Sequence, residues 1–243
     1  MIEISGIHKT YSPDLPNEKK VLKGVDLFVG SGETQFLLGG NGAGKTTLLR
    51  IVSSLLPMSS GSVLVNGHDS RENAAGIKNS IGFFSATTGL YERLSGREFL
   101  HFFAKLYGLD DSDFSKKIAE IGSVFKLDDC LDMRCSAMSS GQKQKMNIAR
   151  AILHDPEIYI MDEPTLGLDV ESLAGILDFI IYQREHGKTM LIVTHNMEMV
   201  HKLGGKVAFL VDGVIRHNLS VAQMIEQSGK DNLIDAYRYF ANV

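Results

Sequence analysis

The sequence predicts an α/β fold, in which a mostly parallel sheet is joined to an N-terminal antiparallel β part and an inserted helical lobe. Short strand patterns separated by turn signals fill the first third of the chain, whereas helical patterns alone run through about residues 95–155. Strand and helix patterns alternate again from residue 156, which is typical of a parallel sheet covered on both faces. We therefore expect one domain, 1–243, with a core at about 1–94 and 156–243 and a helical lobe at about 95–155.

The elements of the core follow from local patterns. Apolar segments bounded by turn residues predict strands at residues 1–11, 21–30, 34–38, 62–69, 80–85, 156–164, 188–195, 206–213 and 214–218. Helical spacing predicts helices at residues 46–56, 170–187 and 196–204, and two more helices at the end of the chain. The stretch 34–56 therefore passes from a strand through a glycine-rich loop into a helix.

The lobe begins at a helix start signal. Ser95 and Glu98 stand at the spacing of a capping box, which satisfies free N–H groups at a helix N-terminus. An apolar stripe with helical spacing follows, and we interpret it as lobe core: Phe99, Phe102, Phe103, Leu106 and Tyr107. Further helices are predicted at 113–127 and after Ser140.

Composition limits the possible functions. The chain has 243 residues, of which 44% are apolar, so it can bury a full-sized core. Its formal net charge is −4 without a dense Lys/Arg run, which argues against nucleic acid as a partner. We expect neither a signal peptide nor a membrane span, hence a soluble protein or one attached to a membrane through another protein. Cys130 and Cys135 are expected to be free thiols in a reducing compartment.

Residues 39–47, GGNGAGKTT, form the strongest motif of the chain. A glycine, a four-residue gap, a second glycine, a lysine and a threonine make a P-loop when they lie between a strand and a helix. The backbone N–H groups of such a loop surround phosphate oxygens, Lys45 adds a positive charge, and the Thr46 hydroxyl can bind Mg²⁺. We predict that the nucleotide phosphates are bound by Gly39, Gly40, Asn41, Gly42, Ala43, Gly44, Lys45, Thr46 and Thr47.

Three further side chains are placed at the ends of buried strands. Asp162 ends IYIMD, and carboxylates at that end of a parallel strand face the ligand crevice, where Asp162 can hold Mg²⁺. Glu163 follows and is suited to orient or deprotonate the attacking water. His195 ends LIVTH, where it can donate a hydrogen bond to the terminal phosphate. A charged pair that merely ends a strand, and a surface histidine, are the structural alternatives.

The stretch MSSGQKQKMNIAR, 138–150, offers two interpretations. Ser139 and Gln142 stand at capping-box spacing, so a well-capped helix explains the pattern by itself. Small residues before a helix also make an anion site, because the N–H groups of its first turn are free. That would give the chain a second phosphate cradle.

Taken in order, NGAGKTT, SSGQKQK, IYIMDEPTLGLD and LIVTH resemble the motif set of ATP-binding cassette (ABC) ATPases. The resemblance implies ATP and Mg²⁺ as ligands and ATP hydrolysis as the activity. It also implies that Ser139, Ser140, Gly141 and Gln142 form the signature motif, which contacts ATP held by the P-loop of a second ATPase subunit. The two cradles would then belong to one site formed head to tail by two chains, and we expect a homodimer.

The resemblance also implies roles for single residues. Tyr11, otherwise an ordinary strand tyrosine, matches the aromatic residue that stacks on adenine. Asp162 matches the Walker B aspartate, and Lys45, Glu163 and His195 match catalytic groups. The D-loop at the dimer interface is matched by Leu166, Gly167, Leu168 and Asp169.

The sequence departs from the family pattern at three places. The signature reads Met138, Ser139, Ser140, Gly141 instead of Leu-Ser-Gly-Gly, and Gly40 replaces a more usual proline. Ala86 stands where the family has a glutamine that reaches the metal and relays motion to the membrane subunit.

The stretch TTGLYERLSGREFL, 87–100, resembles a subgroup of bacterial exporters for sodium or drugs. That likeness implies an integral membrane subunit as partner, docked at 86–94 and the lobe. The chain would then be cytoplasmic, held peripherally at the inner face of the cell membrane. Alternatives are a soluble ABC ATPase that acts on nucleic acid or ribosomes, and a weakly hydrolytic member of an asymmetric ATPase pair.

Overall fold

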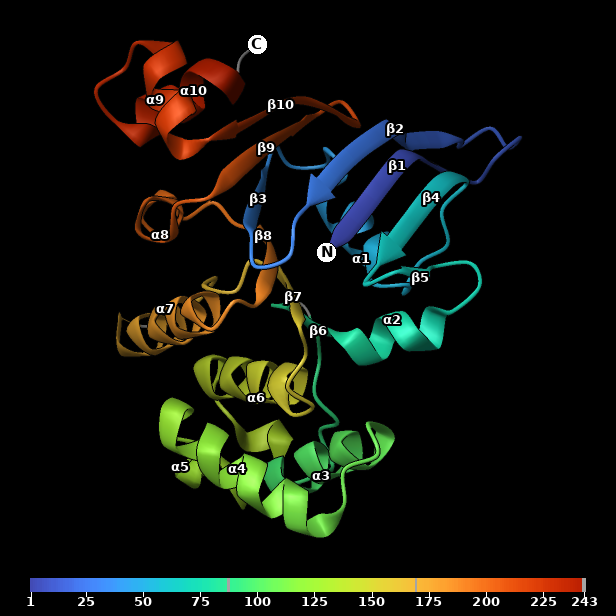
Figure 1. Ribbon diagram of the computed structural model, residues 1–243. Helices are drawn as coiled ribbons and strands as arrows, with labels where there is room; N and C mark the ends of the chain where they lie inside the picture. Colours follow the sequence, from blue (N-terminus) through green and yellow to red (C-terminus); the bar gives the residue numbers. More distant parts are fainter. Residues whose placement is uncertain (87, 169, 242–243) are drawn as a thin grey trace.

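The computed structural model describes residues 1–86, 88–168 and 170–241 and contains two sheets with helices packed against them (Figure 1). A four-stranded antiparallel sheet has the strand order β2-β1-β4-β5, and a six-stranded sheet has the order β10-β9-β3-β8-β7-β6. In the larger sheet the described strands pair in parallel, except that β10 runs antiparallel to β9. The predicted fold, a mostly parallel sheet with an N-terminal antiparallel part and a helical lobe, is confirmed.

The smaller sheet is formed by the first part of the chain. Its strands are β1 (Ile2–Tyr11), β2 (Lys19–Val29), β4 (Ser60–Val65) and β5 (His68–Asp69). Alternating residues of these strands, such as Ile2 and Ile4, are buried, as expected for a sheet with one covered face. They share one apolar core with α1 (Lys45–Val52) and with one face of the larger sheet.

The larger sheet contains the strands after which most of the predicted site residues follow. Its strands are β3 (Thr34–Leu38), β6 (Ile81–Ser85), β7 (Ile158–Asp162), β8 (Thr189–Val193), β9 (Lys206–Val211) and β10 (Val214–Ser220). Every residue of β3, β7 and β8 is buried, because both faces of this part of the sheet are covered. Parallel pairing therefore brings the carboxyl ends of β3, β7 and β8 to the same edge.

The helices of the core match the predicted ones apart from a missed short helix. Those predicted are α1, α7 (Val170–Glu185), α8 (Met197–Leu203), α9 (Val221–Ser228) and α10 (Leu233–Ala241). The sequence analysis missed α2 (Ala74–Ser80), which the Asn73 side chain caps and which buries Ile77 alone. A short helix with one buried residue has no apolar periodicity to reveal it. No helix in the described part of the chain is sufficiently long and apolar to cross a membrane.

The lobe consists of α3 (Gly96–Leu106), α4 (Asp111–Phe125), α5 (Asp128–Leu131), a 3₁₀ turn (Cys135–Ala137) and α6 (Ser140–Ile152). Both predicted capping boxes, Ser95 with Glu98 and Ser139 with Gln142, are present. Figure 1 shows α6 between the sheet and α3 with α4, and one apolar core is continuous through all of them. The division at residues 95 and 155 therefore stays a prediction. Within this core Cys130 and Cys135 are free and buried.

The interpretation of the aromatic stripe as lobe core is wrong in part. Phe99 is 1% exposed, but Phe102 and Leu106 are 44% and 64% exposed, because they lie on a face of α3 that no other element of the described chain covers. Tyr91, which is 53% exposed, adds to this surface, and its ring centroid lies 5.6 Å from that of Phe102. We call Tyr91, Phe102 and Leu106 the lobe patch.

A half-buried histidine joins the end of α6 to the sheet. His154 donates from Nε2 to the carbonyl of Ile81 at 3.0 Å and stacks on Tyr107 with ring centroids 3.7 Å apart. Its Nδ1 is buried without a partner among the described residues. Burial lowers the pKa of His154 to about 4.

His154 is predicted to make the fold sensitive to acid. Between its folded pKa of about 4 and its ordinary value, the unfolded chain binds the extra proton, so stability falls as the pH falls through this window. We expect this histidine to lower the free energy of unfolding by about 2 kcal/mol between pH 7.5 and pH 5. Urea unfolding should show a flatter pH dependence for His154→Phe, whereas His201→Gln, at an exposed position, should keep the wild-type slope. An undiminished slope in His154→Phe would contradict this assignment.

Candidate functional site

The loop between β3 and α1 folds tightly around the Lys45 ammonium. Lys45 Nζ donates to the carbonyl oxygens of Gly39 at 2.7 Å and Gly40 at 3.0 Å. Gly44 has φ +107°, and a Cβ there would lie 2.7 Å from Leu22 Cδ2, so only glycine fits this turn. Burial lowers the pKa of Lys45, while the nearby carboxylates Asp162 and Glu163 act in the opposite direction.

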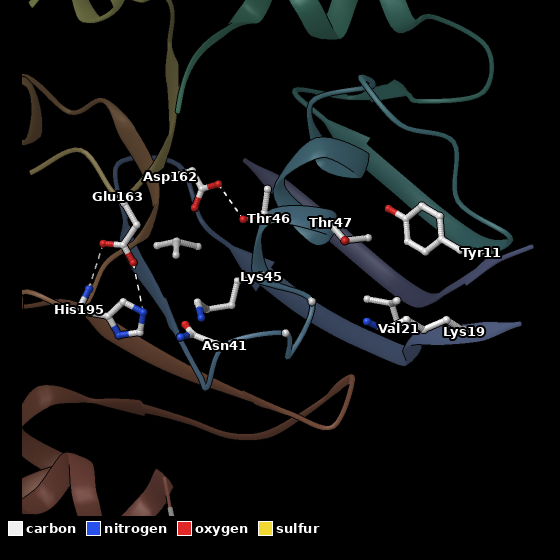
Figure 2. Close-up of a pocket in the computed structure, with 13 residues that line it drawn as sticks. Tyr11, Lys19, Val21, Asn41, Lys45, Thr46, Thr47, Asp162, Glu163 and His195 are labelled. Atoms are coloured by element: carbon white, nitrogen blue, oxygen red, sulfur yellow. Dashed lines mark hydrogen bonds and ion pairs between the residues drawn. The ribbon is translucent and has the colours of Figure 1, made fainter. Parts of the chain in front are cut away.

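A cavity of about 400 Å³ opens beside this loop (Figure 2). It is lined by Tyr11, Lys19, Val21, Asn41, Gly42, Gly44, Lys45, Thr46, Thr47, Asp162, Glu163, Val193 and His195. The structure thus brings together predicted residues from four separate segments of the chain. The remaining P-loop residues, Gly39, Gly40 and Ala43, line a neighbouring cavity of about 330 Å³ instead.

Thr46 and Asp162 form the part of the cavity suited to a metal ion. The Thr46 hydroxyl donates to Asp162 Oδ2 at 2.8 Å, which joins the first turn of α1 to the end of β7. Asp162 is only 6% exposed. A hydroxyl and a carboxylate oxygen this close together are ligands of the type that Mg²⁺ prefers.

Glu163 and His195 form a pair next to Asp162. His195 Nε2 lies 3.3 Å from Glu163 Oε1, and the His195 backbone N–H donates to Oε2 at 3.3 Å. The backbone of Glu163 is in the left-handed region, with φ 53°, and its N–H donates to the carbonyl of Val193. Burial raises the pKa of Glu163, which the adjacent His195 counteracts. The carboxylate is therefore oriented on both oxygens and is made more basic by its surroundings.

The opposite end of the cavity is formed by the smaller sheet. Figure 2 shows Tyr11 there with Lys19 and Val21, across the P-loop from Glu163 and His195. Tyr11 pairs with Lys19 in the register of β1 and β2, and its ring is 38% exposed. The sequence analysis missed Lys19 and Val21. Their positions depend on the register between β1 and β2. The polar segment SPDLPNEKK between the two strand patterns does not show what that register is.

The signature residues do not reach this cavity. Ser139, Ser140, Gly141 and Gln142 lie at the N-terminus of α6, where Ser139 is the cap and none of the four lines the cavity. Ser139 Oγ accepts from the Gln142 backbone at 3.2 Å, and Gln142 Oε1 accepts from the Ser139 backbone at 2.9 Å. In one chain these residues are thus an exposed helix cap.

Three side chains of α6 connect this helix to the catalytic edge, and the sequence analysis missed them. Gln144, Asn147 and Arg150 recur every three residues along one side of α6. They donate to the backbone carbonyls of Pro164 at 2.7 Å, Thr88 at 2.6 Å and Phe83 at 3.1 Å. The helix is thereby tied to the residue after Glu163 and to β6 with the loop that follows it.

Ala86, which departs from the family pattern, and the predicted D-loop both lie near the carboxyl end of β7. The Ala86 backbone N–H donates to the carbonyl of Asp162 at 3.2 Å, so position 86 lies beside the metal residues without a polar side chain. The D-loop residue Leu166 is 59% exposed and Gly167 has φ +73°, whereas Asp169 lies outside the described residues.

Residues 22–166 match the sequence profile of the ABC transporter family, which covers more than half of the chain. The chain belongs to this family. It is 37% identical over 221 residues to the ABC transporter ATP-binding protein NatA of Bacillus subtilis, covering 89% of this chain and 90% of NatA. It is 32% identical over 234 residues to the linearmycin resistance ATP-binding protein LnrL of the same species, covering 96% and 74% of the two chains.

A solved bacterial ABC transporter cassette, described as dimeric, has the same fold with a TM-score of 0.83 and 25% identity. The match covers 90% of this chain and 98% of that one. The protein is an ATP-binding and ATP-hydrolysing enzyme of the ABC family, and its fold is that of the family's ATPase cassettes.

Asn147 is predicted to hold the loop after β6 in place. Asn147→Ala removes the donor to the Thr88 carbonyl, and we expect the free energy of unfolding to fall by about 1–3 kcal/mol. Hydrogen exchange should become faster at the backbone amides of residues 88–94. Lys143→Ala, which removes no described hydrogen bond from the same helix, should change neither quantity. Unchanged exchange in Asn147→Ala would mean that the loop is held by other contacts.

Proposed function

We propose that the protein is the ATPase subunit of a transporter, and that it powers export through a separate integral membrane subunit. The proposal rests on one observation: the residues predicted to contact ATP lie in two separate places on the chain. The P-loop, the metal residues and Glu163 with His195 share one cavity, whereas the signature residues lie outside it at the exposed end of α6.

The cavity fits a nucleotide from one end to the other. The N–H groups of the loop and the Lys45 ammonium would hold the phosphates, and Tyr11 with Val21 would contact the adenine. Thr46 and Asp162 would hold Mg²⁺, which when bound neutralises part of the phosphate charge. Gly39, Gly40 and Ala43 belong to the same loop, although they line the neighbouring cavity, and they are proposed to bind the phosphates as well.

Glu163 is proposed as the base that positions the attacking water. Its carboxylate stands beside Asp162, and His195 orients it through contacts to both oxygens. Burial favours uptake of a proton by Glu163 when water is deprotonated. His195 is half-exposed at the mouth of the cavity, from which it can donate to the terminal phosphate.

A second copy of the chain would complete the site. The free N–H groups at the start of α6 attract an anion, and Ser139 is exposed there. In a head-to-tail dimer the residues Ser139 to Gln142 of one chain would contact ATP bound in the other. The dimeric state named for the similar cassette supports this arrangement.

The lobe patch is proposed to dock the membrane subunit. Tyr91, Phe102 and Leu106 are exposed large apolar side chains within the predicted docking region, which consists of residues 86–94 and the lobe. A net charge of −4 gives no reason to prefer nucleic acid as the partner. The chain would then act at the cytoplasmic face of the cell membrane, and the resistance function named for LnrL supports export as the direction.

Glu163→Gln is expected to lower ATP turnover about 100-fold or more while ATP still binds, because the amide cannot accept the proton of the water. The variant should also accumulate the ATP-bound dimer. Light scattering with ATP and Mg²⁺ should therefore show twice the monomer mass of 26.7 kDa. Glu72→Gln, an exposed carboxylate outside the cavity, is the matched control for turnover.

A second substitution separates dimer formation from nucleotide binding at the P-loop. Adding Ser139→Arg to Glu163→Gln should abolish the doubling of mass without loss of nucleotide binding, because Ser139 lies outside the cavity. Turnover retained in Glu163→Gln would refute Glu163 as the base. A monomer that binds ATP would refute the homodimer and assign the second half of the site to another chain.

A photoreactive amino acid placed at Phe102 tests the docking surface. We expect irradiation of whole cells to join this position to an integral membrane protein, because the side chain is exposed beside Tyr91. The same probe at Ile234 on α10, which is 50% exposed, is the control. Membrane cross-links at Ile234 and none at Phe102 would contradict docking through the lobe patch.

A further inference from the structure

A separate cavity of about 450 Å³ lies between α4 of the lobe and α7, beside β7. None of its lining residues belongs to the lining of the catalytic cavity. Its size is in the range of pockets that hold small organic molecules. It is thus a candidate site that ATP binding and hydrolysis do not use.

The floor of this cavity is aromatic. Phe125, Tyr159 and Phe179 are at most 5% exposed, and the Phe179 ring centroid lies 5.2 Å from Phe125 and 5.9 Å from Tyr159. Val124 and Tyr182, which are 49% and 55% exposed, form part of its edge. Such walls favour an apolar, flat ligand, and the faces of the rings attract a cation.

The Tyr159 hydroxyl is a polar group in this apolar floor. The residue is 1% exposed, and its hydroxyl forms no hydrogen bond with the described residues. The hydroxyl oxygen is not fully buried and opens to the cavity, where a ligand atom can form a hydrogen bond with it. Burial, aided by the negative charges of Asp155 and Glu120, raises the pKa of Tyr159, so the hydroxyl stays neutral and faces a negative field.

The charged residues around the cavity are mainly acidic. Glu120, Asp155 and Asp178 contribute three carboxylates, against the single ammonium of Lys117. Lys117 pairs with Glu120 at 3.0 Å, and Asp155 pairs with Lys188 at 2.8 Å. Asp178, exposed on α7, has no ion pair or hydrogen bond within the described part of the chain. Its exposed carboxylate is therefore available to a cation bound at this edge of the cavity.

We propose that this cavity binds a small organic cation, with an aromatic body on the floor and a primary ammonium group directed to Asp178. The Tyr159 hydroxyl accepts a hydrogen bond from the ammonium group, and the aromatic rings contact the body of the ligand. Such a ligand touches α4 of the lobe and α7 at the same time. The site is independent of the proposed transport function, because it rests on none of the ATP contacts.

Three probes of similar size and different charge test the proposal on the full chain. They are 1-naphthylmethylamine, the neutral 1-naphthalenemethanol and the anion 1-naphthylacetate, each measured by isothermal titration calorimetry without nucleotide. We expect the amine to bind at least about fivefold more tightly than the alcohol, and the carboxylate to bind most weakly. Equal affinity for all three, or no binding of the amine at millimolar concentration, would overturn the proposal.

Conservative variants locate the binding. Asp178→Asn should weaken the amine about fivefold and leave the alcohol unchanged, while Tyr159→Phe should weaken both by about three- to tenfold. Glu226→Gln, an exposed carboxylate on α9 outside the cavity, should change neither affinity. Amine binding that Asp178→Asn and Tyr159→Phe leave intact would place the ligand elsewhere and refute this site.

Discussion

The site depends on the parallel pairing of β3, β7 and β8. Because these strands run in the same direction in adjacent positions, their carboxyl ends lie along one edge of the sheet. The P-loop leaves β3 at this edge, Asp162 and Glu163 leave β7, and His195 follows β8. The Thr46–Asp162 hydrogen bond and the Glu163–His195 contacts then close the edge into one constellation.

The helix α6 extends this constraint into the lobe. Its N-terminus carries the signature residues, while Gln144, Asn147 and Arg150 bind backbone carbonyls at the sheet edge. A displacement of α6 would therefore act on the backbone next to Glu163 and on the loop after β6. With Ala86 lacking a polar side chain, the Asn147–Thr88 hydrogen bond is a direct connection between α6 and that loop.

The chain thus has two kinds of ligand surface with different physical character. The catalytic cavity is polar and built from strand ends and a glycine loop, which suits phosphates and a metal ion. The cavity between α4 and α7 is aromatic with an acidic edge, which suits an organic cation. The Tyr159 side chain belongs to β7, the strand that also ends in Asp162, so both surfaces share one strand of the sheet.

The sequence by itself determined the order of elements, the P-loop and the strand-end residues Asp162, Glu163 and His195. These are local signals: glycine spacing, capping boxes and polar residues after apolar runs depend on neighbours in the chain. Tertiary structure decided the rest, because it depends on which distant segments meet. Lys19 and Val21 line the site because of the register between β1 and β2. Phe102 and Leu106 stay exposed because no described element covers that face of α3. The hydrogen bonds of Gln144, Asn147 and Arg150 form because α6 packs against the sheet edge.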